Sequence, residues 1–235
     1  MLNVYEFSVV AGMPTAVFGA SGDSVHEFRI DVAFDHEDTQ RFMSLTPEFL
    51  IREYGKPDFI WASPPCVTFS LASQAHHWTG GKNAYVPKTK AALDNQNIIR
   101  HLRYIVEQTK PRYGFIIENP RGILRKLPLL DGIERRTVTY CAYGDNRMKP
   151  TDLWGNIPNW FARPMCKRNS PCHEAAPRGS SSGTLGRKGK DRAQIPDQLG
   201  TEIRNAIITY KTYTEGNANV QPASSNGLLL QAIGS

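Results

Sequence analysis

A cysteine stands directly behind two prolines at the end of an apolar run. Residues 57–62 read as a short buried strand, and Ser63, Pro64, Pro65 and Cys66 follow it. Since proline cannot donate to a sheet ladder and restricts the residue before it, the strand should stop at Ser63 and present Cys66 on a stiff loop. In an open α/β sheet, ligands bind at the carboxyl ends of the strands. An exposed thiol there could act as a nucleophile, and a small buried cysteine is the alternative.

A second strand that ends at a proline carries a carboxyl group. Residues 113–117 are largely apolar, and Glu118 and then Pro120 end the run. Apolar residues recur at helical spacing over 91–108, between the two strands, so a right-handed strand–helix–strand crossover is expected. This crossover would place Glu118 beside Cys66 at one edge of a parallel sheet. A helix cap is the other interpretation of Glu118.

A thiol and a carboxyl group at one sheet edge suit chemistry on a pyrimidine ring. Carbon 5 of cytosine is a poor nucleophile, but a thiolate that adds to carbon 6 turns the ring into an enamine that can attack an electrophilic methyl group. A protonated acid near ring nitrogen 3 stabilises the charge that develops. Cys66 could supply the thiolate and Glu118 the acid, once the base has left the duplex. The two residues therefore favour methyl transfer to cytosine in DNA as a hypothesis.

The remaining sequence predicts the elements of one α/β domain with a small addition. The polar residues 67–90 are expected to be a mobile loop that closes over the site. Further strands are predicted at 4–7, 28–32, 137–140 and 152–154. Helices are predicted at 15–18, from a cap at Thr46 to Gly55, at 91–108, at 122–126 and at 195–210. The buried stripe of the helix over 91–108 should comprise Leu93, Ile98, Ile99, Leu102, Ile105 and Val106.

The expected organisation along the chain has four parts. They are a catalytic domain over 1–154, a short recognition region over 155–194, a returning helix over 195–213 and a disordered tail over 214–235. No apolar run is long enough to span a membrane, and the first residues lack the basic start and apolar core of a signal peptide. These features predict a soluble cytoplasmic protein.

The charge distribution points to an anionic partner. The formal net charge is +6, and basic residues gather late in the chain, at Arg163, Lys167, Arg168, Arg178, Arg187, Lys188, Lys190 and Arg192. A basic patch confined to one region is typical of nucleic-acid binding, and a solvated loop is the alternative.

Three of the four cysteines cluster late in the sequence with a histidine. Cys141, Cys166, Cys172 and His173 could supply three sulfurs and one imidazole, which suits tetrahedral zinc. A zinc ion would also fix a long irregular segment. The spacing is looser than in a Cys-x-x-Cys knuckle, so loop thiols and a surface histidine are the alternative. Disulfides are not expected inside a cell.

Six segments of the sequence together resemble a known family. They are Pro-Asp-Phe-Ile-Trp-Ala-Ser-Pro-Pro-Cys at 57–66, Phe-Ile-Ile-Glu-Asn-Pro-Arg-Gly at 115–122, Thr-Val-Thr-Tyr-Cys at 137–141, Arg-Met-Lys-Pro-Thr-Asp-Leu-Trp at 147–154, Cys-His-Glu-Ala-Ala-Pro-Arg-Gly-Ser at 172–180 and Ile-Pro at 195–196. In this order they resemble the DNA cytosine-5 methyltransferases, and most closely the small phage and prophage branch. The resemblance covers roughly residues 45–208.

The resemblance implies a fold, a cofactor and residue roles. It implies a Rossmann-like α/β sheet with a small basic target-recognition insertion, S-adenosylmethionine as methyl donor, and a monomer acting on double-stranded DNA with a flipped cytosine. By motif, Cys66 is the nucleophile, Glu118 contacts the base, and Arg147 lies near the base and the adduct. Further substrate contacts are assigned to Asn119, Pro120, Lys149 and Arg178. Protection of phage DNA from restriction is implied by the same resemblance.

The donor-binding region departs from the family pattern. The family opens with Phe-x-Gly-x-Gly, whereas here only one late glycine, Gly12, follows Phe7. Donor contacts are assigned to Phe7, Gly12, Asp31 as the ribose-binding acid, and Pro64. Two alternatives stay open: a weakened or inactive homologue that serves as a DNA-binding module, and a transferase that uses a modified donor.

Overall fold

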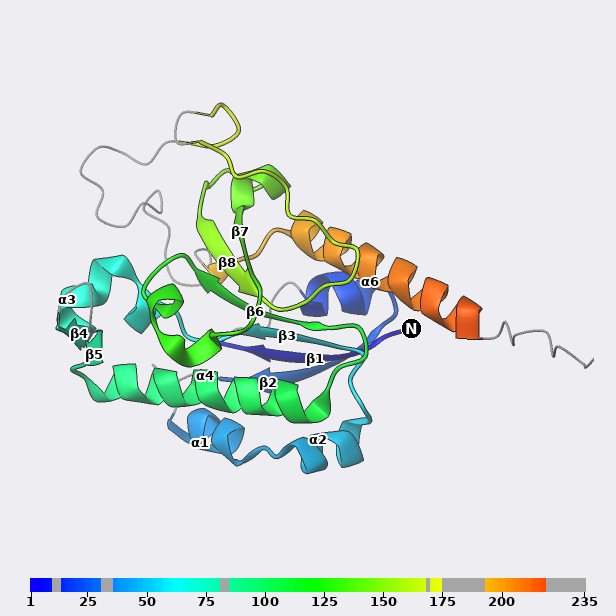
Figure 1. Ribbon diagram of the computed structural model, residues 1–235, viewed down its shortest axis with the longest axis horizontal. Coiled ribbons are helices and arrows are strands. Elements are labelled where there is room, and N and C mark those ends of the chain that lie inside the picture. Colours follow the sequence, from blue (N-terminus) through cyan, green and yellow to red (C-terminus); the bar gives the residue numbers. More distant parts are fainter. Residues whose placement is uncertain (10–13, 31–35, 81–84, 168–169, 175–192, 219–235) are drawn as a thin grey trace, which may run out of the picture.

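A six-stranded sheet forms the centre of the protein, with strand order β2-β1-β3-β6-β8-β7 (Figure 1). The computed structural model describes residues 1–9, 14–30, 36–80, 85–167, 170–174 and 193–218. The strands are β1 (Asn3–Ser8), β2 (Ser24–Arg29), β3 (Phe59–Ser63), β6 (Phe115–Pro120), β7 (Arg135–Thr139) and β8 (Pro150–Trp154). The first four strands of this order are mutually parallel, and β8 runs antiparallel to both β6 and β7.

Helices cover both faces of the sheet (Figure 1). One face carries α1 (His36–Ser44), α2 (Pro47–Tyr54) and α4 (Lys90–Thr109), and the other carries a π-helical turn (Thr15–Gly19) and α6 (Asp197–Ala218). Because successive side chains of a strand point to opposite faces, β3 contributes side chains to the hydrophobic cores on both faces of the sheet. Ile60 packs toward α4, whereas Phe59 and Trp61 pack toward α6. This three-layer arrangement confirms the predicted Rossmann-like α/β fold.

Local sequence signals account for the helices that support β3 and β6. The Phe49 N–H donates to the Thr46 hydroxyl oxygen at 3.1 Å, so Thr46 caps α2 as predicted, and Gly55 ends the helix at a φ of 76°. Helix α4 matches the predicted range, but Leu93 is 50% exposed. That part of the prediction was wrong, because Leu93 lies about two and a half turns from the buried Leu102 and therefore on the opposite side.

Several boundaries differ from the sequence-based expectation. Strand β2 pairs with β1 residue by residue from Ser24 to Arg29, so it begins and ends earlier than the predicted strand at 28–32. Helix α6 extends through Ala218, into the tail that was predicted to be disordered. Residues 155–167 and 170–174 contain no helix or strand, as expected for an irregular segment.

The segment after Cys66 is more structured than a loop. It contains the short helix α3 (Gln74–His77) and a small hairpin of β4 (Trp78–Thr79) and β5 (Val86–Pro87). Trp78 is buried, and its indole N–H donates to the Thr68 carbonyl oxygen at 2.6 Å. The described part of 67–90 therefore has regular structure that the sequence did not predict, because an aromatic side chain anchors the segment to the core. In the described part of the chain, no helix has the length and apolar character needed to cross a bilayer.

Candidate active site

The thiol and the carboxyl group predicted from sequence lie at neighbouring strand ends. Strands β3 and β6 pair in parallel, with Ile60 opposite Phe115 and Ala62 opposite Ile117. The two strands therefore present their carboxyl ends, which lead to Cys66 and Glu118, at one edge of the sheet. This expected arrangement of the strands is confirmed. Cys66 is exposed, so its sulfur is accessible to a ligand.

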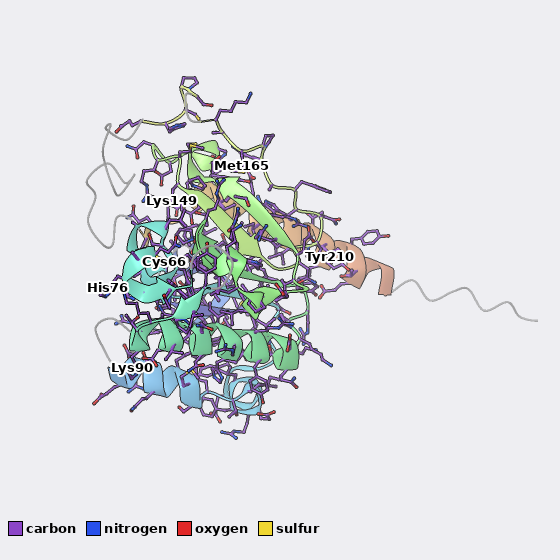
Figure 2. The ribbon with its side chains drawn as sticks, turned by 60° about the vertical axis from the view of Figure 1, so that its left-hand side comes forward. Cys66, His76, Lys90, Lys149, Met165 and Tyr210 are labelled. Carbon is purple, nitrogen blue, oxygen red and sulfur yellow. The ribbon has the colours of Figure 1, made fainter. Side chains whose placement is uncertain are left out.

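The last two strands bring a further turn to this edge. Strands β6 and β7 are both antiparallel to β8, so β7 ends at the same edge as β6. The connection from Tyr140 to Lys149 therefore starts and finishes beside the ends of β3 and β6. It contains Cys141, Asp145 and Arg147, and Figure 2 shows Lys149 close to Cys66 on one side of the molecule.

The loop that carries Cys66 is held from several directions. Pro64 and Pro65 are buried, and the Phe69 N–H donates to the Cys66 carbonyl oxygen at 3.1 Å. Next along the loop, the Asn95 side-chain amide of α4 donates to the Thr68 hydroxyl oxygen at 2.7 Å. These contacts fix the backbone on both sides of the exposed thiol.

A close backbone approach ties this loop to the segment after β6. The Ile123 N–H donates to the Phe69 carbonyl oxygen at 2.7 Å. A Cβ atom at Gly122 would lie only 2.2 Å from that oxygen, so glycine is required there. The thiol loop and the loop after Glu118 are therefore one connected unit.

Glu118 is a buried carboxyl group with a phenol as partner. Only 5% of Glu118 is exposed, and the Tyr140 hydroxyl donates to its Oε1 at 2.8 Å. Burial first, and then the charge of Glu118 and this hydrogen bond, raise the pKa of Tyr140 well above its ordinary value. Tyr140 therefore remains a protonated donor at neutral pH and holds the carboxyl group in place.

Lys149 holds its ammonium group against Tyr140, the partner of Glu118. Its Nζ lies 4.5 Å from the centre of the Tyr140 ring, a cation–π contact. Burial lowers the pKa of Lys149, whereas the charges of Glu118 and then Cys66 act to raise it. The same ammonium therefore interacts with both groups. Its backbone φ of 25° is unusual for a residue other than glycine, which is a form of strain found at functional sites.

Arg147 reaches the same edge but is already paired. Only 3% of its side chain is exposed, and its Nε lies 2.9 Å from each carboxylate oxygen of Asp145. A second guanidinium nitrogen donates to the Gln194 carbonyl oxygen at 3.2 Å, just before α6. Arg147 therefore joins the turn between β7 and β8 to the start of α6.

Asn119 and Pro120 occupy the end of β6. The Asn119 amide donates to the Pro64 carbonyl oxygen at 3.4 Å, which joins the ends of the two parallel strands. The Asn119 side-chain oxygen is buried and has no hydrogen-bond partner among the residues that the structure describes. Pro120 is half-buried opposite Thr151 of β8.

The structure describes two of the four residues predicted to contact the donor, Phe7 and Pro64. The Phe7 ring is fully buried and stacks on Phe28 at 4.9 Å between centroids, so Phe7 belongs to the core on the α4 side of the sheet. Pro64 is buried, and its carbonyl oxygen accepts from the Asn119 amide. Gly12 and Asp31, like the predicted DNA contact Arg178, lie outside the described residues.

A buried carboxylate supports the end of β1, where the region predicted to bind the donor begins. Glu6 of β1 is fully buried and accepts hydrogen bonds from the Ser8 hydroxyl at 3.0 Å and from the Thr15 N–H at 3.0 Å. Ser8 is also the register partner of Ser63. The chain therefore leaves β1 directly beside the strand end that leads to Cys66.

Three of the four predicted metal ligands lie close together next to this edge, and the fourth, Cys166, contacts one of them. The ligand atoms of Cys141, Cys172 and His173 all lie within 4.8 Å of one another. Cys166 Sγ lies 3.2 Å from Cys172 Sγ, and Cys172 Sγ lies 3.4 Å from His173 Nδ1. Burial raises the pKa of Cys141 to about 12, and the contact with Cys172 lowers the pKa of Cys166.

Tyr140 is the site residue that sequence reasoning missed. It stands inside the segment at 137–141 that resembles the family, but a tyrosine at a strand end looks like an ordinary core residue. Its role is visible only in space, because the contact with Glu118 crosses 22 residues of sequence and an intervening strand. No local signal in the sequence marks it.

Sequence comparison finds a viral relative. The chain is 29% identical over 159 residues to a protein of Frog virus 3 (isolate Goorha) named "Probable DNA (cytosine-5)-methyltransferase", and the match covers 62% of this chain and 73% of that protein. No family model matches the sequence.

Structure comparison finds solved methyltransferases of low identity. S. pombe Dnmt2 is 10% identical with a TM-score of 0.40, and the match covers 69% of this chain and 51% of that chain. The Entamoeba histolytica methyltransferase EhMeth is 12% identical with a TM-score of 0.44, and the match covers 75% of this chain and 56% of that chain. The chain thus spans about half the length of these solved structures.

Proposed function

We propose that this chain, whose resemblance to the DNA cytosine-5 methyltransferase family is supported by its viral relative, methylates carbon 5 of cytosine in double-stranded DNA. One observation carries the proposal: an exposed thiol and a buried carboxyl group stand at neighbouring parallel strand ends, with an ammonium group that interacts with both. Such an enzyme would act as a monomer, in the cytoplasm, on a cytosine flipped out of the duplex.

The mechanism assigns a role to each group at the edge. The Cys66 thiolate adds to carbon 6, so a carbon–sulfur bond forms and electron density moves toward carbon 5 and nitrogen 3. Glu118 in its protonated form, positioned by the Tyr140 hydroxyl, donates a hydrogen bond to nitrogen 3 and stabilises the charge there. S-adenosylmethionine, when bound, would supply the methyl group to carbon 5 and would leave as S-adenosylhomocysteine as its sulfur–methyl bond breaks. The carbon 5 proton then leaves to water, and the electron pair of that bond restores the ring double bond and expels the Cys66 thiolate from carbon 6.

We assign the activation of Cys66 to Lys149. A cation beside a thiol favours the thiolate, which is the nucleophilic form. The Lys149 ammonium interacts with Cys66 and is held over the Tyr140 ring at 4.5 Å. Arg147 is a weaker candidate for this role, because its guanidinium group is paired with Asp145.

Replacing Lys149 should make Cys66 less reactive. In the Lys149→Met variant we expect iodoacetamide to alkylate Cys66 roughly three to ten times more slowly at pH 7, because the thiolate loses its neighbouring cation. The midpoint of the alkylation rate against pH should move upward. Burial lowers the pKa of Lys149 itself, so in the wild type this assistance should fade at a lower pH than an exposed lysine would allow. Peptide mass spectrometry at Cys66 measures both effects.

Lys90→Met is the matched control for this experiment. The Lys90 side chain is 77% exposed and pairs with Asp94 on α4, and Figure 2 shows it well away from Cys66. Alkylation of Cys66 should be unchanged in this variant. Equal rates in the Lys149 variant and the wild type would remove Lys149 from the mechanism.

The test of the proposed function is the direct detection of its product. The full chain is incubated with double-stranded DNA and S-adenosylmethionine, and the DNA is then digested to nucleosides for mass spectrometry. We expect 5-methylcytosine to accumulate, and calorimetry should detect binding of the donor. A cytosine with a different added mass would identify a modified donor. DNA binding with no donor affinity and no modified base would reject the enzyme in favour of a binding module.

A further inference from the structure

We propose that Cys141, Cys166, Cys172 and His173 form a structural zinc site that fixes the irregular segment before residue 175 to the catalytic edge. The four residues come from separate parts of the chain: Cys141 follows β7, and the others lie in residues 155–174. The ligand atoms of Cys141, Cys172 and His173 nevertheless lie within 4.8 Å of one another, and Cys166 Sγ lies 3.2 Å from Cys172 Sγ. None of the four cysteines forms a disulfide, so no disulfide accounts for this cluster.

The distances between the ligand atoms are near those of a tetrahedral zinc site. With zinc–sulfur bonds of about 2.3 Å, the ligand atoms of a tetrahedral site lie about 3.5 to 3.8 Å apart. The observed contacts are 3.2 Å from Cys166 Sγ to Cys172 Sγ and 3.4 Å from Cys172 Sγ to His173 Nδ1. The three atoms from Cys141, Cys172 and His173 lie within 4.8 Å of one another. Side-chain shifts of about an ångström at Cys166, Cys172 and His173 would bring the four ligand atoms to this spacing.

The chemistry of the donor set selects zinc over harder cations. Three thiolates and one imidazole suit zinc, whereas calcium and magnesium require oxygen ligands. Four protein ligands fill the coordination sphere and leave no place for a reacting water, which is typical of structural rather than catalytic zinc. The site is also accessible to the ion, since Cys172 is exposed and Cys166 half-buried.

Hydrogen bonds already position the ligands from outside. The Cys166 N–H donates to the Thr139 hydroxyl oxygen at 3.0 Å, at the end of β7. The Glu174 N–H donates to the Asn146 carbonyl oxygen at 2.9 Å, and the Asn146 amide returns a bond of 3.1 Å to Glu174 Oε1. These bonds attach both ends of the ligand segment to the β7–β8 connection, the same connection that carries Arg147 and Lys149.

A structural metal would stabilise the irregular residues that carry three of the four ligands. Residues 155–167 and 170–174 contain no helix or strand, so few backbone hydrogen bonds hold them together. Cys141 directly follows Tyr140, the partner of Glu118. Zinc at Cys141 would therefore stabilise the end of β7 and the recognition segment together, and its free energy of binding would add to that of folding.

Metal analysis of purified full-length protein tests the site. We expect about one zinc ion per chain in the wild type and less than about a tenth of that in Cys172→Ala, because three ligands hold zinc far more weakly than four. Cys66→Ala is the matched control, since it removes a thiol outside the cluster and should keep one zinc ion per chain. This pair also separates the two proposals, because Cys66→Ala should lose DNA chemistry while retaining the metal.

Cobalt substitution keeps the test decisive if the variant folds poorly. Wild-type protein loaded with Co²⁺ should show the thiolate-to-cobalt absorption of a tetrahedral sulfur site, and added Zn²⁺ should remove it. Zinc-free wild-type protein with four titratable thiols and no cobalt absorption would overturn the proposal. A wild-type mass lower by two hydrogens, which indicates a Cys166–Cys172 disulfide, would overturn it as well.

Discussion

The Cys66→Ala variant is expected to lose the covalent complex with DNA that contains 5-fluorocytosine. Fluorine at carbon 5 cannot leave as a proton does, so a thiolate that has added to carbon 6 remains bound to the base. Wild-type protein with donor should therefore form a stable adduct, and the variant should form none. Methyl transfer should fall by at least about 10⁴-fold, the scale on which removal of a covalent nucleophile acts. Denaturing gel electrophoresis detects the adduct.

Val67→Ala provides the matched control for this loss. Val67 is the next residue along the same loop, and 62% of it is exposed. Its substitution leaves the sulfur and the hydrogen bonds of the loop in place, so trapping should persist. The thermal unfolding of Cys66→Ala should match that of the wild type, since an exposed thiol contributes little to the core. A trapped complex that survives in Cys66→Ala would assign the nucleophile to another residue.

The positions of Cys66 and Glu118 could be predicted from sequence because the signals that mark them are local. A run of apolar residues ending at prolines indicates where β3 and β6 stop. The helical periodicity of 91–108 then requires a parallel crossover, which places Cys66 and Glu118 together. Each step depends on residues close in sequence or on a topology rule with few exceptions.

The contacts of Tyr140 and Lys149 with these two residues could not be predicted because they depend on strand order. The chain makes β6, β7 and β8 in sequence, but β8 lies between the other two. Because β8 lies between them, β7 ends at the same sheet edge as β6, and the connection from Tyr140 to Lys149 lies there. The Tyr140 hydroxyl then reaches Glu118, and the Lys149 ammonium interacts with Cys66. Nothing in the spacing of these residues distinguishes this order from one in which β7 pairs with β6.

Asp152 shows how a motif residue can be structural. It stands in the segment at 147–154 that resembles the family, which alone would suggest a role in chemistry. In the structure Asp152 is fully buried in β8, accepts from Arg125 Nε at 2.8 Å and accepts from the Thr137 hydroxyl at 2.7 Å. These contacts join β7, β8 and the turn after β6. The carboxylate therefore holds together the strands that position Tyr140 and Lys149.

Asp152→Ala is accordingly expected to lower the free energy of unfolding by about 3–5 kcal/mol, which is the typical cost of removing one partner from a buried ion pair. The Arg125 side chain is only 20% exposed, so the variant leaves a largely buried cation without its carboxylate. Urea unfolding measures the change as a lower midpoint at constant slope. Asp152→Asn keeps the shape and some of the hydrogen bonds and should lose less, which allows a measurement if the alanine variant does not fold.

The exposed pair between Arg52 and Glu53 on α2 provides the contrast for this measurement. The two side chains meet at 2.7 Å, but they are 68% and 45% exposed, so water screens the pair. Glu53→Ala should therefore cost at most about 1 kcal/mol. Equal losses at Glu53 and Asp152 would show that burial does not set the strength of the Asp152 contact. In that case β7 and β8 would have to be held by their backbone ladder alone, and the position of Tyr140 and Lys149 would not depend on Asp152.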